Sequence, residues 1–299
     1  MLNFKRVELK DRDIIQSYLD NQPYRASDLS FTNIFSWGPK YNTEFATTDD
    51  WLFIRFRDNN NRNSYLKPIG QAKIKEAIDM IIEDHKQFDT IFQIRGLTND
   101  MIDTIEEAMP GVFDYNLNRS VSDYIYTTEK LIQLKGKKLQ SKRNHINRFK
   151  RENDWKYISL HGEDEYVKEC KSLLKLWTKV NGDDADPDED FDVQATNFML
   201  DNFEYLNLKG GIICVDGEIA AFTIGSQVTK DTFVVHIEKA RTDIHGAYTI
   251  VNQQFVENEL SEYTYVNREE DMGIENLRKA KESYQPDILL EKSVARFKK

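Results

Sequence analysis

Apolar positions in the first half of the chain follow both helical and strand periodicities. Ile74, Ile78 and Ile81 recur at helical spacing, which predicts an amphipathic helix over 71–87. Residues 51–57 and 64–68 are typical of two strands paired across a polar turn. The same patterns predict helices at 11–20 and from Thr98 to Pro110, and strands at 90–95 and 112–126.

The second half predicts a longer alternation of helices and strands. Asp216–Gly217 is a type I′ hairpin signal, because both central residues of that turn need positive φ. We expect helices at 129–153, 163–180, 191–205, 246–260 and 274–284, and strands at 155–160, 210–215, 218–228, 231–239, 263–266 and 287–297. This order favours a mixed sheet with flanking helices.

The element order also suggests how the chain divides. The first half ends in a strand–helix–strand–helix–strand order similar to the end of the second half. The 299 residues suit two domains of ordinary size. We therefore expect an α+β protein with an N-terminal domain over 1–128 and a C-terminal domain over 129–299.

Composition and charge exclude several classes of protein. The net charge of −10 argues against indiscriminate nucleic-acid binding, and we expect no DNA partner. No segment approaches the roughly 20 apolar residues of a membrane span, and the charged N-terminus lacks a signal-peptide core, so we expect a cytoplasmic protein. Cys170 and Cys214 show no metal-ligand spacing and are expected as reduced core thiols, with no metal site. The oligomeric state is left open.

One basic segment stands out against the acidic whole. Residues 135–151 hold eight lysines and arginines and no acidic residue. Charge screening acts over about 8 Å, so the patch can attract a phosphate or carboxylate locally, such as that of a transfer RNA backbone, coenzyme A or a lipid head group. Lys142, Arg143, Asn144 and Asn147 are the candidate substrate contacts. The alternative is a solvated helix face paired with the acidic loop.

That acidic loop lies at 183–192 and holds seven carboxylates. A calcium loop needs glycine at its sixth position and glutamate at its twelfth, and neither register of this loop meets both requirements. We interpret it as a solvated surface loop, or as a lid that repels or mimics phosphate.

A strand–helix junction in the second half carries further candidates. Glu238 lies at the end of the strand at 231–239, and the next helix begins near Gly246. The free N–H groups at a helix N-terminus suit an anion. Glu238 is either a functional carboxylate or an ordinary exposed strand-end residue.

The segment that follows the strand at 263–266 adds a second group. Asn267, Arg268 and Glu269 come directly after the strand, where strand ends line ligand crevices in open sheets. Arg278 and Lys281 lie three positions apart and share a helix face. We take all five as candidate substrate contacts.

Four stretches resemble a known family. They are SKRNHINRF (141–149), EKARTDIHGAYTIVNQQF (238–255), VNREEDMGIENLRKAKESYQP (266–286) and SDLSFTNIFSW (27–37). They look like soluble bacterial proteins grouped with the phosphatidylglycerol lysyltransferase C-terminal domain. The resemblance implies two tandem GNAT-like acyltransferase domains, related to the Fem-type aminoacyltransferases, which use aminoacyl-tRNA as donor.

The resemblance also implies roles for single residues. GNAT enzymes often place a general base where Glu238 stands, and a tyrosine that protonates the leaving group where Tyr284 stands. Their phosphate loop follows the pattern Arg/Gln-x-x-Gly-x-Gly/Ala. Arg241 and Gly246 match its first and last positions and are the candidate substrate contacts that the resemblance implies, whereas Ile244 replaces the first glycine and Asp243 adds a negative charge.

These observations lead to three hypotheses about function. The first is direct acyl or aminoacyl transfer to an amine or hydroxyl, because no Ser–His–Asp or Cys–His arrangement is evident and the histidines at 145, 161, 236 and 245 are scattered. The second is a coenzyme A-dependent N-acetyltransferase. The third is a non-catalytic module that binds an anionic ligand. We expect no resident cofactor, with acyl-coenzyme A or aminoacyl-tRNA as the donor in the first two.

Overall fold

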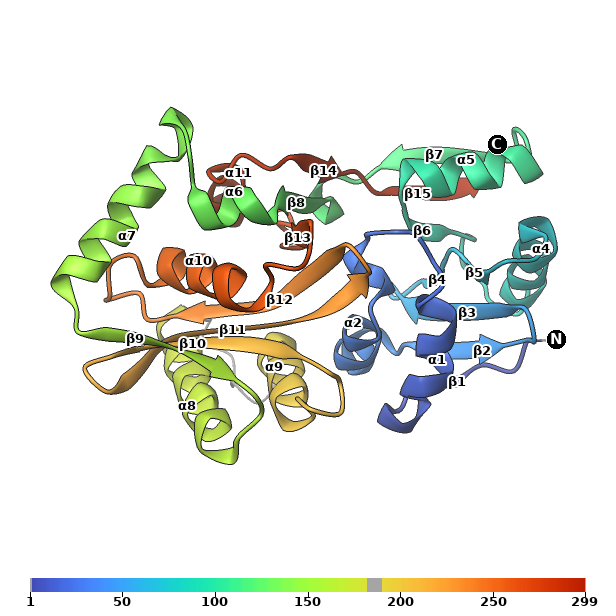
Figure 1. Cartoon of the computed structure of the whole chain (residues 1–299). Coiled ribbons are helices and arrows are strands. Elements are labelled where there is room, and N and C mark those ends of the chain that lie inside the picture. The colour runs from blue at the N-terminus through green and yellow to red at the C-terminus, as the bar shows by residue number, and fades with distance from the viewer. Residues whose placement is uncertain (1, 182–189, 299) are drawn as a thin grey trace. The chain divides into compact units, whose positions relative to one another are not determined.

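The chain folds into two compact units (Figure 1). The structure, a computed structural model, describes residues 2–181 and 190–298. Unit 1 comprises Met1–Asp123, Glu270–Ile274 and Leu289–Lys299, and unit 2 comprises Tyr124–Glu269 and Glu275–Ile288. The last segment of the chain therefore packs with the first unit. The domain limits of 1–128 and 129–299 stay a proposal, and residues 183–189 of the acidic loop lie outside the described residues.

Unit 1 is an α+β layer structure. Its helices are α1 (Arg12–Leu19), α2 (Phe31–Ser36), α3 (Gly38–Tyr41), α4 (Ile74–His85) and α5 (Asn99–Ala108), with 3-10 turns at Leu9–Asp11, Ser27–Leu29 and Arg119–Val121. Its strands are β1 (Lys5–Arg6), β2 (Glu44–Thr47), β3 (Trp51–Arg57), β4 (Asn63–Leu66), β5 (Ile69–Gly70), β6 (Ile94–Leu97), β7 (Phe113–Leu117) and β15 (Ser293–Phe297).

The sheet of unit 1 is mixed. Its order is β1-β2-β3-β4-β6-β15-β7, and β5 pairs with β3. Strands β4 and β6 run parallel, whereas β15 pairs antiparallel with both β6 and β7. Helix α4 connects the parallel strands and buries Ala77, Ile78 and Ile81, the face that its helical spacing predicts.

Unit 2 repeats this architecture. Its helices are α6 (Thr128–Gln133), α7 (Gln140–Glu152), α8 (Asp164–Asn181), α9 (Phe191–Asp201), α10 (Ala247–Glu259) and α11 (Glu275–Glu282), with a 3-10 turn at Lys137–Leu139. Its strands are β8 (Asp123–Thr127), β9 (Trp155–Leu160), β10 (Lys209–Val215), β11 (Glu218–Thr229), β12 (Thr232–Ala240), β13 (Tyr265–Asn267) and β14 (Ile288–Leu290), the first and last of which cross the unit limits.

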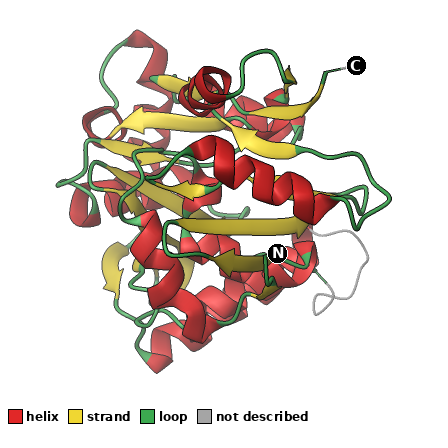
Figure 2. Ribbon diagram, turned by 90° about the vertical axis from the view of Figure 1, so that its right-hand side faces the viewer, coloured by secondary structure: helices red, strands yellow, loops and turns green. Residues whose placement is uncertain are grey.

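The sheet of unit 2 has the order β14-β8-β13-β12-β11-β10-β9. Strands β12 and β13 are parallel and are connected by α10, while β9 to β12 form an antiparallel meander. Helix α10 covers one face of this sheet and α8 and α9 cover the other (Figure 1), and Figure 2 shows the helices in red against the strands in yellow. The α+β prediction with mixed sheets is confirmed.

Backbone conformation explains where the predicted elements hold and where they do not. Asp216 and Gly217 have φ of 52° and 88°, which confirms the type I′ turn between β10 and β11. The long basic helix expected at 129–153 is wrong: Leu134 and Gly136 have φ of 48° and 93°, and they separate α6 from α7. The strand expected at 112–126 is two strands, because a 3-10 turn at Arg119–Val121 interrupts it.

A buried lysine fixes the last strand in unit 1. The Lys292 ammonium lies 2.8 Å from Asp123 and 2.5 Å from Asp28, and its side chain is 1% exposed. Burial acts to lower the pKa of Lys292, but the two carboxylates outweigh it and raise the pKa. The lysine therefore stays charged and ties the start of β15 to the segments at Asp28 and Asp123. No helix among the described residues is long and apolar enough to cross a membrane.

This ion pair gives a stability prediction. K292M leaves Asp123 buried without its cation, which is expected to lower the free energy of unfolding by about 3–5 kcal/mol. Urea denaturation measures the change. The control K73M removes a lysine whose side chain is 85% exposed, and it should change stability by less than about 0.5 kcal/mol. Equal effects of the two substitutions would contradict the assignment.

Candidate functional site

The candidate site lies where two parallel strands of unit 2 separate. Strands β12 and β13 pair at three positions, the last joining Val234 to Asn267. Beyond that point β12 continues to Ala240, whereas the Arg268 N–H donates to the Tyr124 carbonyl on β8 at 2.9 Å. Glu269 then turns the chain with a φ of 57°. Side chains that follow the last paired residues can therefore meet across the opening.

Glu238 and Arg268 form an ion pair across this opening. The Arg268 Nη2 donates to Glu238 Oε1 at 2.9 Å and Oε2 at 3.2 Å, and Asn252 Nδ2 from α10 donates to Oε2 at 3.2 Å. Both charged side chains are less than 15% exposed. Burial acts to lower the pKa of Arg268, but the Glu238 carboxylate raises it, so the guanidinium stays charged.

Two polar atoms of this cluster lack partners. Within the described part of the chain, Arg268 Nη1 and Asn252 Oδ1 are buried and make no hydrogen bond. Buried polar atoms are nearly always satisfied in folded proteins, and exceptions mark functional positions or bound molecules. The cluster thus offers one donor and one acceptor for a ligand.

Tyr284 packs against the same ion pair. The Arg268 guanidinium carbon lies 4.7 Å from the centre of the Tyr284 ring, and the Lys142 ammonium lies 4.1 Å from it. Burial raises the pKa of the Tyr284 hydroxyl, while interactions with Arg268 and Thr249 act in the opposite direction. The hydroxyl therefore keeps its proton at neutral pH and is available as a proton donor.

The pKa of Lys142 is lowered by its position in this cluster. Burial, and then the nearby Arg268, lower its pKa to about 8, whereas Glu238 acts to raise it. At neutral pH it is mostly protonated and can bind an anion, and a small change in its surroundings makes it a neutral amine. Together with Arg268 it gives this opening a positive charge.

A second polar chain spans the same opening, and in it Glu269 is a predicted candidate whereas His236 and Ser226 are not. His236 lies two positions before Glu238 on β12, and so on the same face of the strand. Its Nδ1 lies 2.8 Å from Glu269 Oε1, and its Nε2 lies 2.8 Å from Ser226 Oγ on β11. The alternation of His236 with Glu238 was the available signal. The partners could not be found, since they depend on long-range register.

Other predicted substrate contacts instead form hydrogen bonds to the backbone directly after β13. Asn267 Oδ1 accepts a hydrogen bond from the Glu269 N–H at 2.7 Å, and Lys281 Nζ donates to the Arg268 carbonyl. Both side chains are buried, so they support the position of Arg268. Arg278 is half-buried on α11.

The remaining residues of the basic segment lie on α7. Arg143 donates to the carbonyls of Leu134 and Gly136, the latter at 2.9 Å, and so closes the connection between α6 and α7. Asn144 and Asn147 are exposed, and Asn144 accepts a hydrogen bond from Gln140 at 2.8 Å. Of this group, only Lys142 joins the cluster around Tyr284.

The junction before α10 is arranged differently from a phosphate loop. Arg241 forms ion pairs with Asp243 at 2.8 Å and with Glu218 at 3.3 Å, so its positive charge already has two carboxylate partners. Gly246 has a φ of 85°, and a Cβ added there would lie 2.9 Å from the His145 carbonyl oxygen of α7. The glycine is therefore needed for close packing of α7 on the start of α10. Among the described residues, no His, Cys, Asp and Glu cluster could hold a metal ion.

Comparisons with known proteins agree with this architecture. The sequence profile described as "Phosphatidylglycerol lysyltransferase, C-terminal" matches residues 21–296. A conserved protein of unknown function from Bacteroides thetaiotaomicron is 41% identical, with a TM-score of 0.92 and full coverage of both chains. The structure of L-PGS from Bacillus licheniformis is 14% identical, with a TM-score of 0.67 over 96% of this chain and 92% of that one.

A third similar structure is FemX, at 8% identity, with a TM-score of 0.58 over 98% of this chain and 97% of that one. At such identities the likeness to L-PGS and FemX concerns the fold. The prediction of a tandem GNAT-like fold is confirmed by these matches.

The cluster predicts an unusual titration of one lysine. In ¹³C-lysine NMR spectra, the Lys142 signal, assigned with K142M, should titrate with a midpoint of about 8. The midpoint should fall in E238Q, which removes a charge that raises it, and should rise in R268M, which removes a charge that lowers it. A Lys142 midpoint near the ordinary lysine value of about 10.4 would contradict the described environment.

Proposed function

The chain belongs to the family of phosphatidylglycerol lysyltransferase C-terminal domains, and from this we propose that it transfers an acyl or aminoacyl group from an activated donor to an amine or hydroxyl. The observation that carries the proposal is the cluster of Glu238, Arg268, Tyr284 and Lys142 at the opening between β12 and β13. It combines a carboxylate, a protonated hydroxyl and two cations, the groups that such a transfer needs.

The transfer would proceed directly, without an acyl-enzyme. The lone pair of the acceptor attacks the donor carbonyl carbon, and the acceptor's proton passes to Glu238. The bond from that carbon to the donor oxygen or sulfur breaks, and Tyr284 supplies the proton to the leaving atom. Arg268, with its unpaired Nη1, and Lys142 stabilise the negative charge that develops on the carbonyl oxygen.

Aminoacyl-tRNA is the donor that the surface of unit 2 supports best. Lys135, Lys137 and Lys138 are exposed beside α7, and within the described residues no carboxylate pairs with them. Such a group of lysines suits a phosphate backbone. Coenzyme A is less suited, because Arg241, which would bind its phosphates, already forms ion pairs with Asp243 and Glu218.

A binding protein of the same fold is the second candidate. One observation favours it: Glu238 already accepts hydrogen bonds from both Arg268 and Asn252, so its carboxylate oxygens are already engaged by other side chains of unit 2. In this case the cations of the cluster would hold an anionic ligand without turnover. Catalysis and binding predict different outcomes for the same substitutions.

The test uses the full chain with total tRNA charged with one radiolabelled amino acid at a time. Acceptors are vesicles containing phosphatidylglycerol, small amines and small alcohols, and labelled acetyl-coenzyme A is assayed in parallel. We expect label to move from at least one aminoacyl-tRNA to an acceptor. E238Q and Y284F should reduce the rate by about a hundredfold or more, because each removes a proton-transfer group.

Matched controls are E257Q and Y205F, which change an exposed carboxylate and a 43% exposed tyrosine of unit 2 and should leave the rate unchanged. Transfer from acetyl-coenzyme A alone would replace the aminoacyl donor with a coenzyme A thioester. Retained tRNA binding with no transfer by any donor would favour the binding protein.

A further inference from the structure

Two arginines of unit 1 project from the face of its sheet that lies away from α4. Ile94 on β6 pairs with Ala295 on β15, so these two residues share one face of the sheet. Arg95 and Arg296 come next along their strands and therefore project from the other face. Ile94 also pairs with Tyr65 on β4, whose hydroxyl donates to a carboxylate of α4 at 2.6 Å. The two arginines thus lie on neighbouring strands, on the face opposite to α4.

A buried carboxylate joins Arg95 to a third arginine. Asp58 directly follows β3, and its side chain is 2% exposed. Its Oδ2 accepts hydrogen bonds from Arg62 Nε at 3.0 Å, from Arg62 Nη2 at 2.7 Å and from Arg95 Nη1 at 2.9 Å. Gln93 Nε2 donates to the same oxygen at 2.9 Å. Burial acts to raise the pKa of Asp58, but the hydrogen bonds from Arg62 and Gln93 lower it to about 2, so the carboxylate stays charged.

Arg296 completes this group, and among the described residues no carboxylate forms an ion pair with it. Its Nη2 donates to Gln93 Oε1 over a long distance of 3.5 Å, and its Nε is buried without a hydrogen bond. Buried polar atoms are nearly always satisfied in folded proteins, and exceptions mark functional positions or bound molecules. The side chain is half-buried, like those of Arg62 and Arg95, so an ion from solvent can reach all three.

The three arginines repel one another. Burial lowers the pKa of Arg95, Asp58 acts to raise it, and Arg62 and Arg296 lower it further. Asp28 also acts to raise it, but this carboxylate already forms an ion pair with a lysine. Three guanidinium groups therefore share one carboxylate, which leaves an excess of two positive charges. A bound anion would relieve this repulsion.

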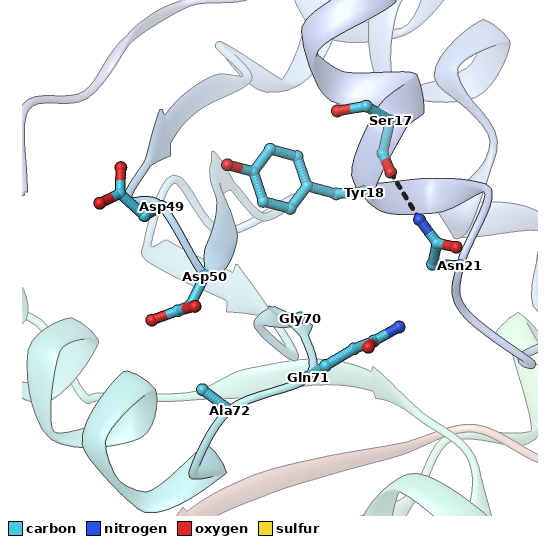
Figure 3. A pocket seen from close by; sticks show the side chains of 8 residues that line it. All are labelled: Ser17, Tyr18, Asn21, Asp49, Asp50, Gly70, Gln71 and Ala72. Atoms are coloured by element: carbon cyan, nitrogen blue, oxygen red, sulfur yellow. Dashed lines mark hydrogen bonds between the residues drawn. The ribbon is translucent and has the colours of Figure 1, made fainter.

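A cavity of unit 1 carries the opposite charge. Its volume is about 600 Å³, and it lies between the end of α1, the turn before β3 and the segment after β5. Figure 3 shows Tyr18 extending across it from α1, with its hydroxyl on the side of Asp49 and Asp50. No lysine or arginine is among the described residues that line it. The arginines, and not this cavity, are therefore where we expect an anion in unit 1.

We propose that Arg62, Arg95 and Arg296 bind a phosphate dianion on this face of unit 1, either as the free ion or as a small phosphate monoester. Guanidinium groups form paired, charge-assisted hydrogen bonds with phosphate oxygens. Asp58 holds two of the arginines in place before the ligand arrives, which reduces the entropy lost on binding. The excess of two charges matches a dianion better than a phosphate diester, which carries one. The proposal does not depend on the transfer assigned to unit 2.

The test is isothermal titration calorimetry of the full chain with inorganic phosphate, at constant ionic strength and about pH 8, where the dianion predominates. We expect saturable binding. Glycerol 3-phosphate is titrated in parallel, and the tighter of the two ligands identifies the free ion or the monoester as the preferred form. Dimethyl phosphate, a diester, should bind at least tenfold more weakly than either. Affinity for the monoester should fall below about pH 6, where it takes up a second proton.

Variants locate the bound phosphate. R296M should weaken binding at least tenfold, and because Arg296 makes one long hydrogen bond the variant should fold. R62M gives the same test if R296M does not fold. The matched control R6M removes an exposed arginine of β1 and should leave binding unchanged, as should K142M in unit 2. No saturable binding, equal binding of dimethyl phosphate, an equal loss in R6M, or a loss in K142M with none in R296M would overturn the proposal.

Discussion

The ion pair between Glu238 and Arg268 is the contact on which the arrangement of unit 2 depends. Parallel strands β12 and β13 share hydrogen bonds at only three positions, and beyond them the backbone groups need other partners. Arg268 takes its backbone partner from β8 and its side-chain partner from β12, so one residue spans the opening. Tyr284 and Lys142 then pack against a charge that is already fixed in place.

How far the sequence predicts this arrangement follows from the range of each interaction. Periodicity and turn residues locate α4, α10 and the β10–β11 hairpin, since these depend on neighbours within a few positions. Glu238, Arg268 and Tyr284 can each be named as candidates from strand ends and family resemblance. That they meet depends on the register of β12 and β13, which no local pattern encodes.

Other features depend on packing that the sequence hides. The sequence predicts one helix over 129–153 although Gly136 interrupts it, and Leu134 adopts a left-handed conformation there, while Arg143 closes the resulting turn instead of facing a substrate. Lys67 lies between Leu66 and Pro68 in a stretch that predicts only a strand end. Its burial follows from contact with Tyr24, more than forty positions earlier, so composition gives no sign of it.

Strand β15 lies between β6 and β7, yet all of unit 2 is synthesised between β7 and β15. During translation the nascent first unit therefore holds a gap in its sheet, with the edges of β6 and β7 unpaired. These edges stay unpaired until β15 has been synthesised, and until then another chain can pair with them. The two units thus cannot be made as independent polypeptides by cutting the gene once between them.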